Sequence, residues 1–184
     1  MSISLVRVSI MFVPNTLLTL STIGSINVSE RHNEQYLVKL IKELVTSYLD
    51  DDKARILLAC GADQDIHNST TFRYIREAEN DAKSRCMGVL TKLDLMHGSK
   101  AEQIWKMLDH QEFDFPNGSW FMTKQLSQDQ LDAGVSHGEA RLREADFFLT
   151  PPWADFSRAF PKQVGIGNLQ AALSKCLTAH IIEA

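Results

Sequence analysis

The sequence predicts an α/β fold of three layers: helices cover both faces of a mostly parallel sheet, and an antiparallel hairpin lies at the sheet's edge. Two observations lead to this prediction. Short, unbroken apolar runs, typical of strands buried on both faces, recur along the chain. Segments with helical periodicity alternate with these runs, and such alternation favours parallel strands joined by helical crossovers.

The hairpin is predicted from the first part of the chain. Residues 3–11 alternate apolar and polar side chains, which is the period-two pattern of a half-buried strand. Pro14-Asn15 is a turn signal, and residues 17–22 form a second short β-rich run. We therefore expect two antiparallel strands before the first helix.

The remaining elements follow from periodicity. We expect buried strands over residues 56–60, 86–90 and 119–122, and helices over residues 34–49, 68–81, from 99 onward, 139–148 and 168–181. Apolar residues of the 34–49 segment fall on one continuous helical stripe.

Composition limits the class of protein. A chain of 184 residues predicts one domain, and 44% hydrophobic residues allow a sizeable core. The net charge of −4 argues against a nucleic-acid footprint, so no nucleic-acid partner is expected. Six histidines and three cysteines show no paired ligand spacing, so no metal site is expected from them. No segment has the length and apolarity of a membrane-spanning helix, so no direct membrane insertion is expected.

The segment with recognisable chemistry follows the apolar run 86–90 and reads Thr91-Lys92-Leu93-Asp94-Leu95. A carboxylate at Asp94 can accept two parallel hydrogen bonds, from N1–H and the exocyclic amine of guanine, and would reject adenine. The Lys92 stem can lie along the base, and the Thr91 hydroxyl can tie neighbouring loops together. The alternative is an ordinary loop in which Asp94 pairs with a cation or caps a helix.

The stretch from Gly88 to Met96 closely resembles the corresponding segment of dynamin-family large GTPases. Looser similarity covers most of the chain, at residues 5–8, 18–20, 37–48, 56–59, 75–79 and 169–181. The resemblance implies a G-domain-like fold of the P-loop NTPase type, with GTP binding and hydrolysis. It also implies G-domain dimerisation across the nucleotide, coupled to membrane remodelling.

The resemblance places a second nucleotide loop after the run 119–122. In the family this loop embraces the base and ribose, and here it contains Lys124 and Gln125, followed by Ser127 and Gln128. Lys124 and Gln125 differ in type from the family's Asn-Arg pair. A polar surface loop is the equal alternative.

Two phosphate-side elements of the family are missing from the sequence. No glycine is followed by Lys-Ser or Lys-Thr, so the phosphate loop is absent and would lie upstream. The family's second switch is degenerate: Ser21 or Thr22 stands where an aspartate is expected, although Gly24 is retained. We therefore expect weak or lost GTP and GDP binding, no Mg²⁺ ligands, no catalytic residue and no GTP hydrolysis by this chain alone.

The expected organisation is a partial, N-terminally truncated dynamin-type G domain over residues 1–184. Residues 1–26 would hold the hairpin and the degenerate switch, 27–130 the guanine-recognition core, and 131–184 the C-terminal helices. Expected partners are guanine nucleotide and a second G domain in a homo- or heterodimer. The resemblance suggests a cytoplasmic protein, with family members often at membranes or microtubules. The alternatives are a non-catalytic protein-interaction module and a truncated gene product.

Overall fold

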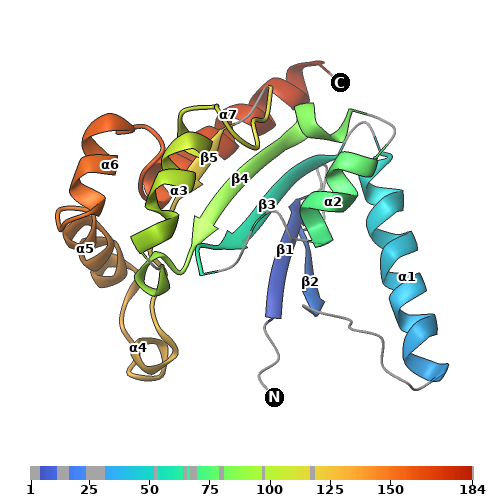
Figure 1. Ribbon diagram of the computed structural model, residues 1–184, viewed down its shortest axis with the longest axis horizontal. Helices are drawn as coiled ribbons and strands as arrows, with labels where there is room; N and C mark the ends of the chain where they lie inside the picture. The colour runs from blue at the N-terminus through green and yellow to red at the C-terminus, as the bar shows by residue number, and fades with distance from the viewer. Residues whose placement is uncertain are drawn as a thin grey trace. The chain divides into compact units, whose positions relative to one another are not determined.

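The computed structural model describes residues 5–11, 17–23, 32–51, 54–63, 66, 70–78, 81–96, 98–116 and 119–183. It is an α/β structure with three parallel strands and several helices, compatible with a G-domain-like fold (Figure 1). Gly24 lies outside the described residues.

The elements follow in chain order. They are β1 (Leu5–Met11), β2 (Leu17–Ile23), α1 (His32–Leu49), β3 (Arg55–Gly61), α2 (Thr70–Glu77), η2 (Ala82–Arg85), β4 (Cys86–Thr91), η3 (Leu93–Leu95), η4 (Gly98–Lys100), α3 (Ala101–Leu108), β5 (Trp120–Met122), α4 (Gln128–Asp132), α5 (His137–Phe147), α6 (Trp153–Ala159) and α7 (Ile166–Glu183). The elements marked η are short 3₁₀ turns.

The strands are hydrogen-bonded in the order β2-β1-β3-β4-β5, with β3, β4 and β5 parallel. Strands β1 and β2 pair antiparallel, with Leu5 opposite Ile23 and Met11 opposite Leu17. Strand β1 also pairs antiparallel with the first residues of β3. The carboxyl ends of β4 and β5 carry the two loops that the sequence singles out.

The chain divides into two compact units. The first comprises Met1–Cys60, Gln64–Gly88 and Phe115–Gly118, and the second comprises Gly61–Asp63, Val89–Asp114 and Ser119–Ala184. Both predicted nucleotide loops therefore belong to the second unit.

In the first unit, the Arg85 side chain binds the carbonyl oxygens at the C-terminal end of α1. Its guanidinium donates hydrogen bonds to the carbonyl oxygens of Leu49, Asp51 and Ala54. The last carbonyls of a helix lack partners within the helix and carry partial negative charge. A distant arginine thus supplies the positive charge that the acidic run after α1 does not provide.

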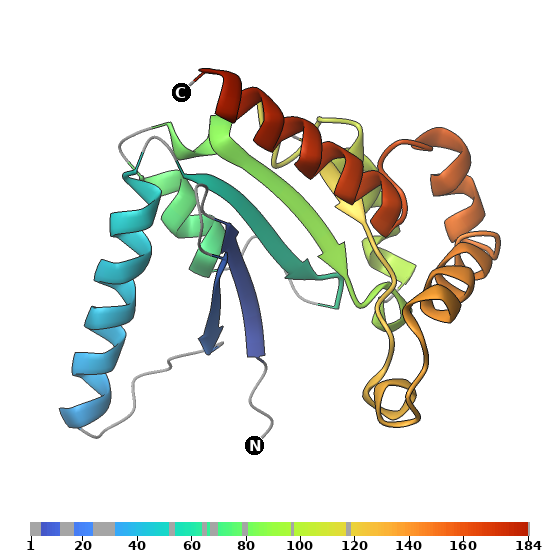
Figure 2. The ribbon, with the colours of Figure 1, turned by 180° about the vertical axis from the view of Figure 1, so that it is seen from behind.

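In the second unit, all three residues of β5 are buried, and Trp120 and Met122 are completely so. Helices α3 and α7 flank β5 on opposite faces, as Figures 1 and 2 show from opposite sides. Trp105 of α3 packs against Phe156 and Phe160, with ring centroids 5.2 and 5.0 Å apart. This aromatic contact fixes α6 beside α3.

Three elements differ from the sequence-based expectation. Helix α2 ends at Glu77, and Asp81 takes a left-handed φ of 34°, which a right-handed helix cannot include. Helices α4 and α6 were not expected. The buried pair Trp153 and Phe156, three residues apart, is the helical signal that announces α6.

Candidate functional site

The loop after β4 is a tight turn. Lys92 adopts the left-handed region, with φ 54° and ψ 40°, and η3 follows it. Leu93 is 1% exposed and anchors the turn, whereas Asp94 and Leu95 are exposed. Because one residue of the turn is buried and its neighbours are not, the backbone itself presents the Asp94 carboxylate at the surface.

The ends of β3 and β4 meet beneath this turn. The N–H of Ala62 donates to the carbonyl of Thr91 at 2.8 Å, and Lys100 Nζ donates to the carbonyl of Asp63 at 2.7 Å. A Cβ added at Gly61 would collide with the Asp63 carboxylate and would contact the Lys92 stem at 3.7 Å. A larger residue at position 61 would therefore displace the Asp63 carboxylate from its place beside Lys92.

The loop after β5 starts inside the protein. Thr123 is completely buried, and its N–H donates to the carbonyl of Leu90 at 3.0 Å. Gln125 is exposed, with its amide 3.4 Å from the Thr123 hydroxyl. Ser127 is the N-cap of α4 and forms a capping box with Gln130. The Ser127 side chain thus has a structural partner, and Gln128 is the first residue of α4.

The two loops meet at one ion pair. Lys124 Nζ lies 3.4 Å from Asp94 Oδ2, and the side chains are 18% and 41% exposed respectively. A partly exposed pair of this kind is worth roughly 0–1 kcal/mol, so bidentate hydrogen bonds from a ligand can compete with it. The structure thus brings together Asp94 and Lys124, which the sequence assigned separately to the two loops.

Lys124 is fixed at several atoms. Its backbone N–H donates to Glu144 Oε1 at 2.9 Å, and its ammonium donates to the carbonyl of Gln125 at 2.7 Å. The ammonium also lies 5.9 Å from the centroid of the Phe147 ring. Sequence reasoning missed Glu144. The available signal is its position four residues before Phe148, the buried C-cap of α5, which places Glu144 on the buried side of that helix.

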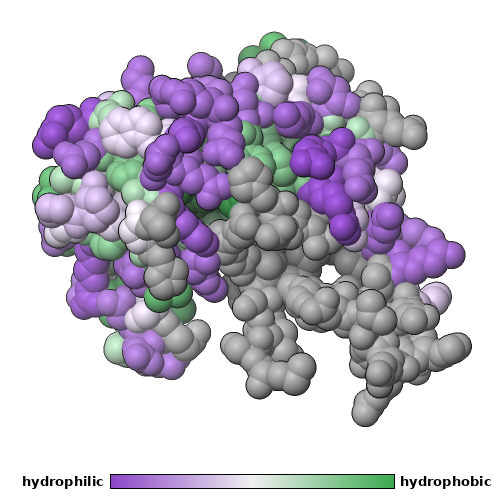
Figure 3. All heavy atoms as spheres, in the orientation of Figure 1, coloured by the Kyte–Doolittle hydropathy of each residue, from purple (hydrophilic) through white to green (hydrophobic). Residues whose placement is uncertain are grey.

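A cavity of about 360 Å³ lies between the loop after β5 and α5. Its lining includes Lys124, Gln125 and Leu126 from the loop and Arg143, Asp146 and Phe147 from α5. On the face shown in Figure 3, hydrophilic and hydrophobic residues are interspersed over α5 and α6. The cavity places both charge signs and an aromatic ring beside the loop.

Among the described residues, no three histidine, cysteine, aspartate or glutamate side chains are grouped so that they could hold a metal ion. Ser21 and Thr22, the residues predicted at the degenerate switch, lie in β2 and carry no carboxylate.

Two of the three cysteines, Cys60 and Cys86, are buried. Burial raises the pKa of Cys60 and of Cys86 to about 12, so both stay protonated at neutral pH and are poor nucleophiles. No helix in the described ranges has the length and apolarity needed to span a bilayer.

The fold and the two loops define an α/β domain with a candidate ligand-binding site at the ends of β4 and β5. No family model matches the chain. It is 31% identical over 146 residues to dynamin-related protein 12A of Glycine max, 30% over 141 residues to phragmoplastin DRP1A of Arabidopsis thaliana, and 29% over 142 residues to dynamin-3 of Homo sapiens.

These matches cover 79%, 77% and 77% of the chain, but 23%, 22% and 15% of the respective relatives. The chain belongs to the dynamin family. It spans less than a quarter of the length of these relatives.

Proposed function

We propose that this chain is the guanine-recognition part of a dynamin-like GTPase domain and binds GTP or GDP through the loops after β4 and β5. The supporting observation is the position of Asp94. Its carboxylate is 41% exposed, follows a buried parallel strand, and lies 3.4 Å from Lys124 of the neighbouring loop. Ligands of open α/β sheets bind outside the carboxyl ends of the strands, where both loops lie.

The charges at this position complement guanine. The Asp94 carboxylate accepts hydrogen bonds from N1–H and the 2-amino group, and the Lys124 ammonium donates to O6. Adenine presents an acceptor at N1 and an amine at C6, so it would place like groups against both side chains. The pairing of an acceptor with a donor at 3.4 Å therefore supports guanine over adenine.

The other predicted residues take supporting roles in this proposal. The methylene stem of the exposed Lys92 covers one face of the base, beside Thr91 and Leu95. Gln125, Ser127 and Gln128 belong to the segment that approaches the ribose. Because the Ser127 hydroxyl already caps α4, its contribution is the shape of the loop.

The phosphate side of the nucleotide is proposed to be held weakly. No Gly-Lys-Ser/Thr segment occurs in the sequence, and the switch residues Ser21, Thr22 and Gly24 include no carboxylate. Phosphoryl transfer depends on backbone donors, a lysine and a metal that offset the charge of the phosphates. We therefore expect micromolar or weaker affinity and no GTP hydrolysis by this chain alone.

In this arrangement, β1 and β2 are the antiparallel edge hairpin of a partial G domain of the P-loop NTPase type. Residues 1–26 carry the hairpin and degenerate switch, 27–130 the guanine-recognition core, and 131–184 the C-terminal helices. A second G domain, from another copy or from a longer relative, is the proposed protein partner across the nucleotide.

The test is calorimetric titration of the purified chain with GDP and with ADP. We expect measurable binding of GDP, no measurable binding of ADP, and loss of the GDP signal in Asp94→Ala. Asp155→Ala is the matched control, because Asp155 is an exposed acid paired with Arg158 at 3.1 Å. Equal responses to GDP and ADP, or none to either, would remove guanine recognition from the proposal.

A further inference from the structure

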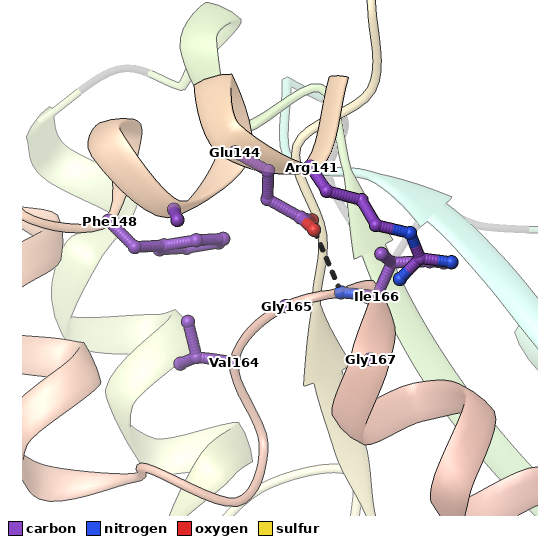
Figure 4. Close-up of a pocket in the computed structure, with 8 residues that line it drawn as sticks. Arg141, Glu144, Phe148, Val164, Gly165, Ile166 and Gly167 are labelled. Atoms are coloured by element: carbon purple, nitrogen blue, oxygen red, sulfur yellow. Dashed lines mark hydrogen bonds between the residues drawn. The ribbon is translucent and has the colours of Figure 1, made fainter. Parts of the chain in front are cut away.

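Glu144 is a buried carboxylate that joins two segments distant in sequence. It is 6% exposed, its Oε1 accepts a hydrogen bond from the Lys124 N–H at 2.9 Å, and its Oε2 accepts one from the Ile166 N–H at 3.0 Å. Figure 4 shows the Glu144 side chain directed at the Ile166 N–H, at the rim of a cavity of about 260 Å³. One acid thus connects the loop after β5 with the start of α7.

Both oxygens of this carboxylate are needed for the arrangement. Glutamate is rarely buried unless its charge is compensated, and here two backbone N–H groups supply charge-assisted hydrogen bonds. A glutamine of the same shape has one acceptor and would direct its amine at the other N–H. Because two N–H donors converge on this one side chain, the position requires a carboxylate.

We infer that Glu144 is a positioning residue for base recognition: by fixing the backbone of Lys124, it holds the Lys124 ammonium beside the Asp94 carboxylate. The inference rests on the proposed function. The chain of contacts is short, because the same residue that donates its N–H to Glu144 places its ammonium 3.4 Å from Asp94. Loss of the hydrogen bond frees the loop at the residue that faces the base.

A purely structural role would act through α7 instead. The Ile166 N–H is one of the donors at the start of that helix that have no partner within the helix, and an acid there is stabilising on its own. The two roles can be separated with Ile166→Pro. This substitution removes the donor to Oε2, leaves the contact with Lys124 intact, and places proline at a helical position that tolerates it.

The experiment combines amide hydrogen exchange of the nucleotide-free chain with the ratio of its GDP and ADP affinities. In Glu144→Gln we expect exchange at the Lys124 and Ile166 amides to accelerate about tenfold or more. We also expect the GDP-over-ADP preference to fall about tenfold. Ile166→Pro should keep that preference within about twofold. Glu139→Gln is the matched control, since Glu139 is an exposed acid on the same helix paired with Arg143 at 2.7 Å.

Several other outcomes would count against the inference. Unchanged exchange at Lys124 in Glu144→Gln would remove the positioning role. Accelerated exchange with an unchanged base preference would leave Glu144 a structural residue, as would an equal loss of preference in Ile166→Pro. If Glu144→Gln does not fold, rapid exchange at Lys124 in the wild-type chain would refute the contact, and slow exchange would support it. Absence of GDP binding by the wild type would refute the proposed function, and hence base positioning, while the exchange data would still report on the contact.

Discussion

The loops after β4 and β5 each contribute one partner of the Asp94–Lys124 ion pair, but their conformations are fixed in different ways. The loop after β4 is shaped by its own backbone: Lys92 turns into the left-handed region, and the buried Leu93 anchors η3. The loop after β5 is shaped by other segments, through Glu144 of α5 and the capping box at Ser127. The conformation of the loop after β4 therefore depends on local sequence, and that of the loop after β5 depends on tertiary contacts.

This difference predicts how each loop responds to substitution. Changes at Lys92, Asp94 or Leu95 in the loop after β4 should alter the chemistry presented to a ligand without altering the fold, because these side chains are exposed. Substitutions around the loop after β5 should instead change the position of the Lys124 side chain. Substitutions in the two loops and in their N-caps should separate these effects.

The largest effect is expected for Asp94→Asn. An asparagine accepts from N1–H through its carbonyl but directs its amine at the 2-amino group of guanine. Xanthine carries a carbonyl at that position and would accept from the amine. We expect the preference for GDP over xanthosine diphosphate to shift by about 1–3 kcal/mol, or roughly fivefold to 150-fold. Titration with both nucleotides measures it.

The fold should be unaffected by this substitution, since Asp94 is 41% exposed. Asp155→Asn removes an equally charged, exposed acid and should leave both affinities unchanged. An unaltered preference in Asp94→Asn would mean that the loop after β4 does not read the base.

The second prediction concerns Lys124→Met. Removing the ammonium deletes a donor to O6, and we expect GDP affinity to fall by about 1 kcal/mol, or roughly fivefold. The free energy of unfolding should change by less than about 1 kcal/mol, because the ion pair is partly exposed. Tighter GDP binding in this variant would show instead that Lys124 competes with guanine for Asp94. Lys106→Met, which breaks an exposed pair at 2.8 Å, is the control.

The sequence could predict the first loop because its information is local. An apolar strand, a turn and an exposed acid follow one another within ten residues, and the structure places Asp94 at the surface accordingly. Glu144 could not be assigned in this way, because its role depends on a fold that brings it to Lys124, 20 residues away. Ser127 shows the opposite case: its capping box with Gln130 is a readable pattern. The resemblance assigned the same residue to the nucleotide loop.

The third prediction concerns the left-handed turn at Lys92. Glycine avoids a penalty of about 1–2 kcal/mol for a side chain in this region, but loses about 0.5–1 kcal/mol to backbone entropy. We expect Lys92→Gly to unfold at the same or slightly higher denaturant concentration, while GDP affinity falls about fivefold because the stem over the base is lost. Lys92→Arg should retain the affinity. A parallel loss in both variants would contradict the proposed stem contact.

The smallest effect is expected for the two serine N-caps. Ser136 caps the eleven-residue α5, so Ser136→Ala should lower the free energy of unfolding by about 1 kcal/mol. Ser127 caps only the five-residue α4, so Ser127→Ala should cost less than about 1 kcal/mol. Both variants should keep the GDP-over-ADP preference, because Lys124 remains attached to Glu144. A clear loss of preference in Ser127→Ala alone would show that the capping box, and not the buried carboxylate, sets the position of the loop after β5.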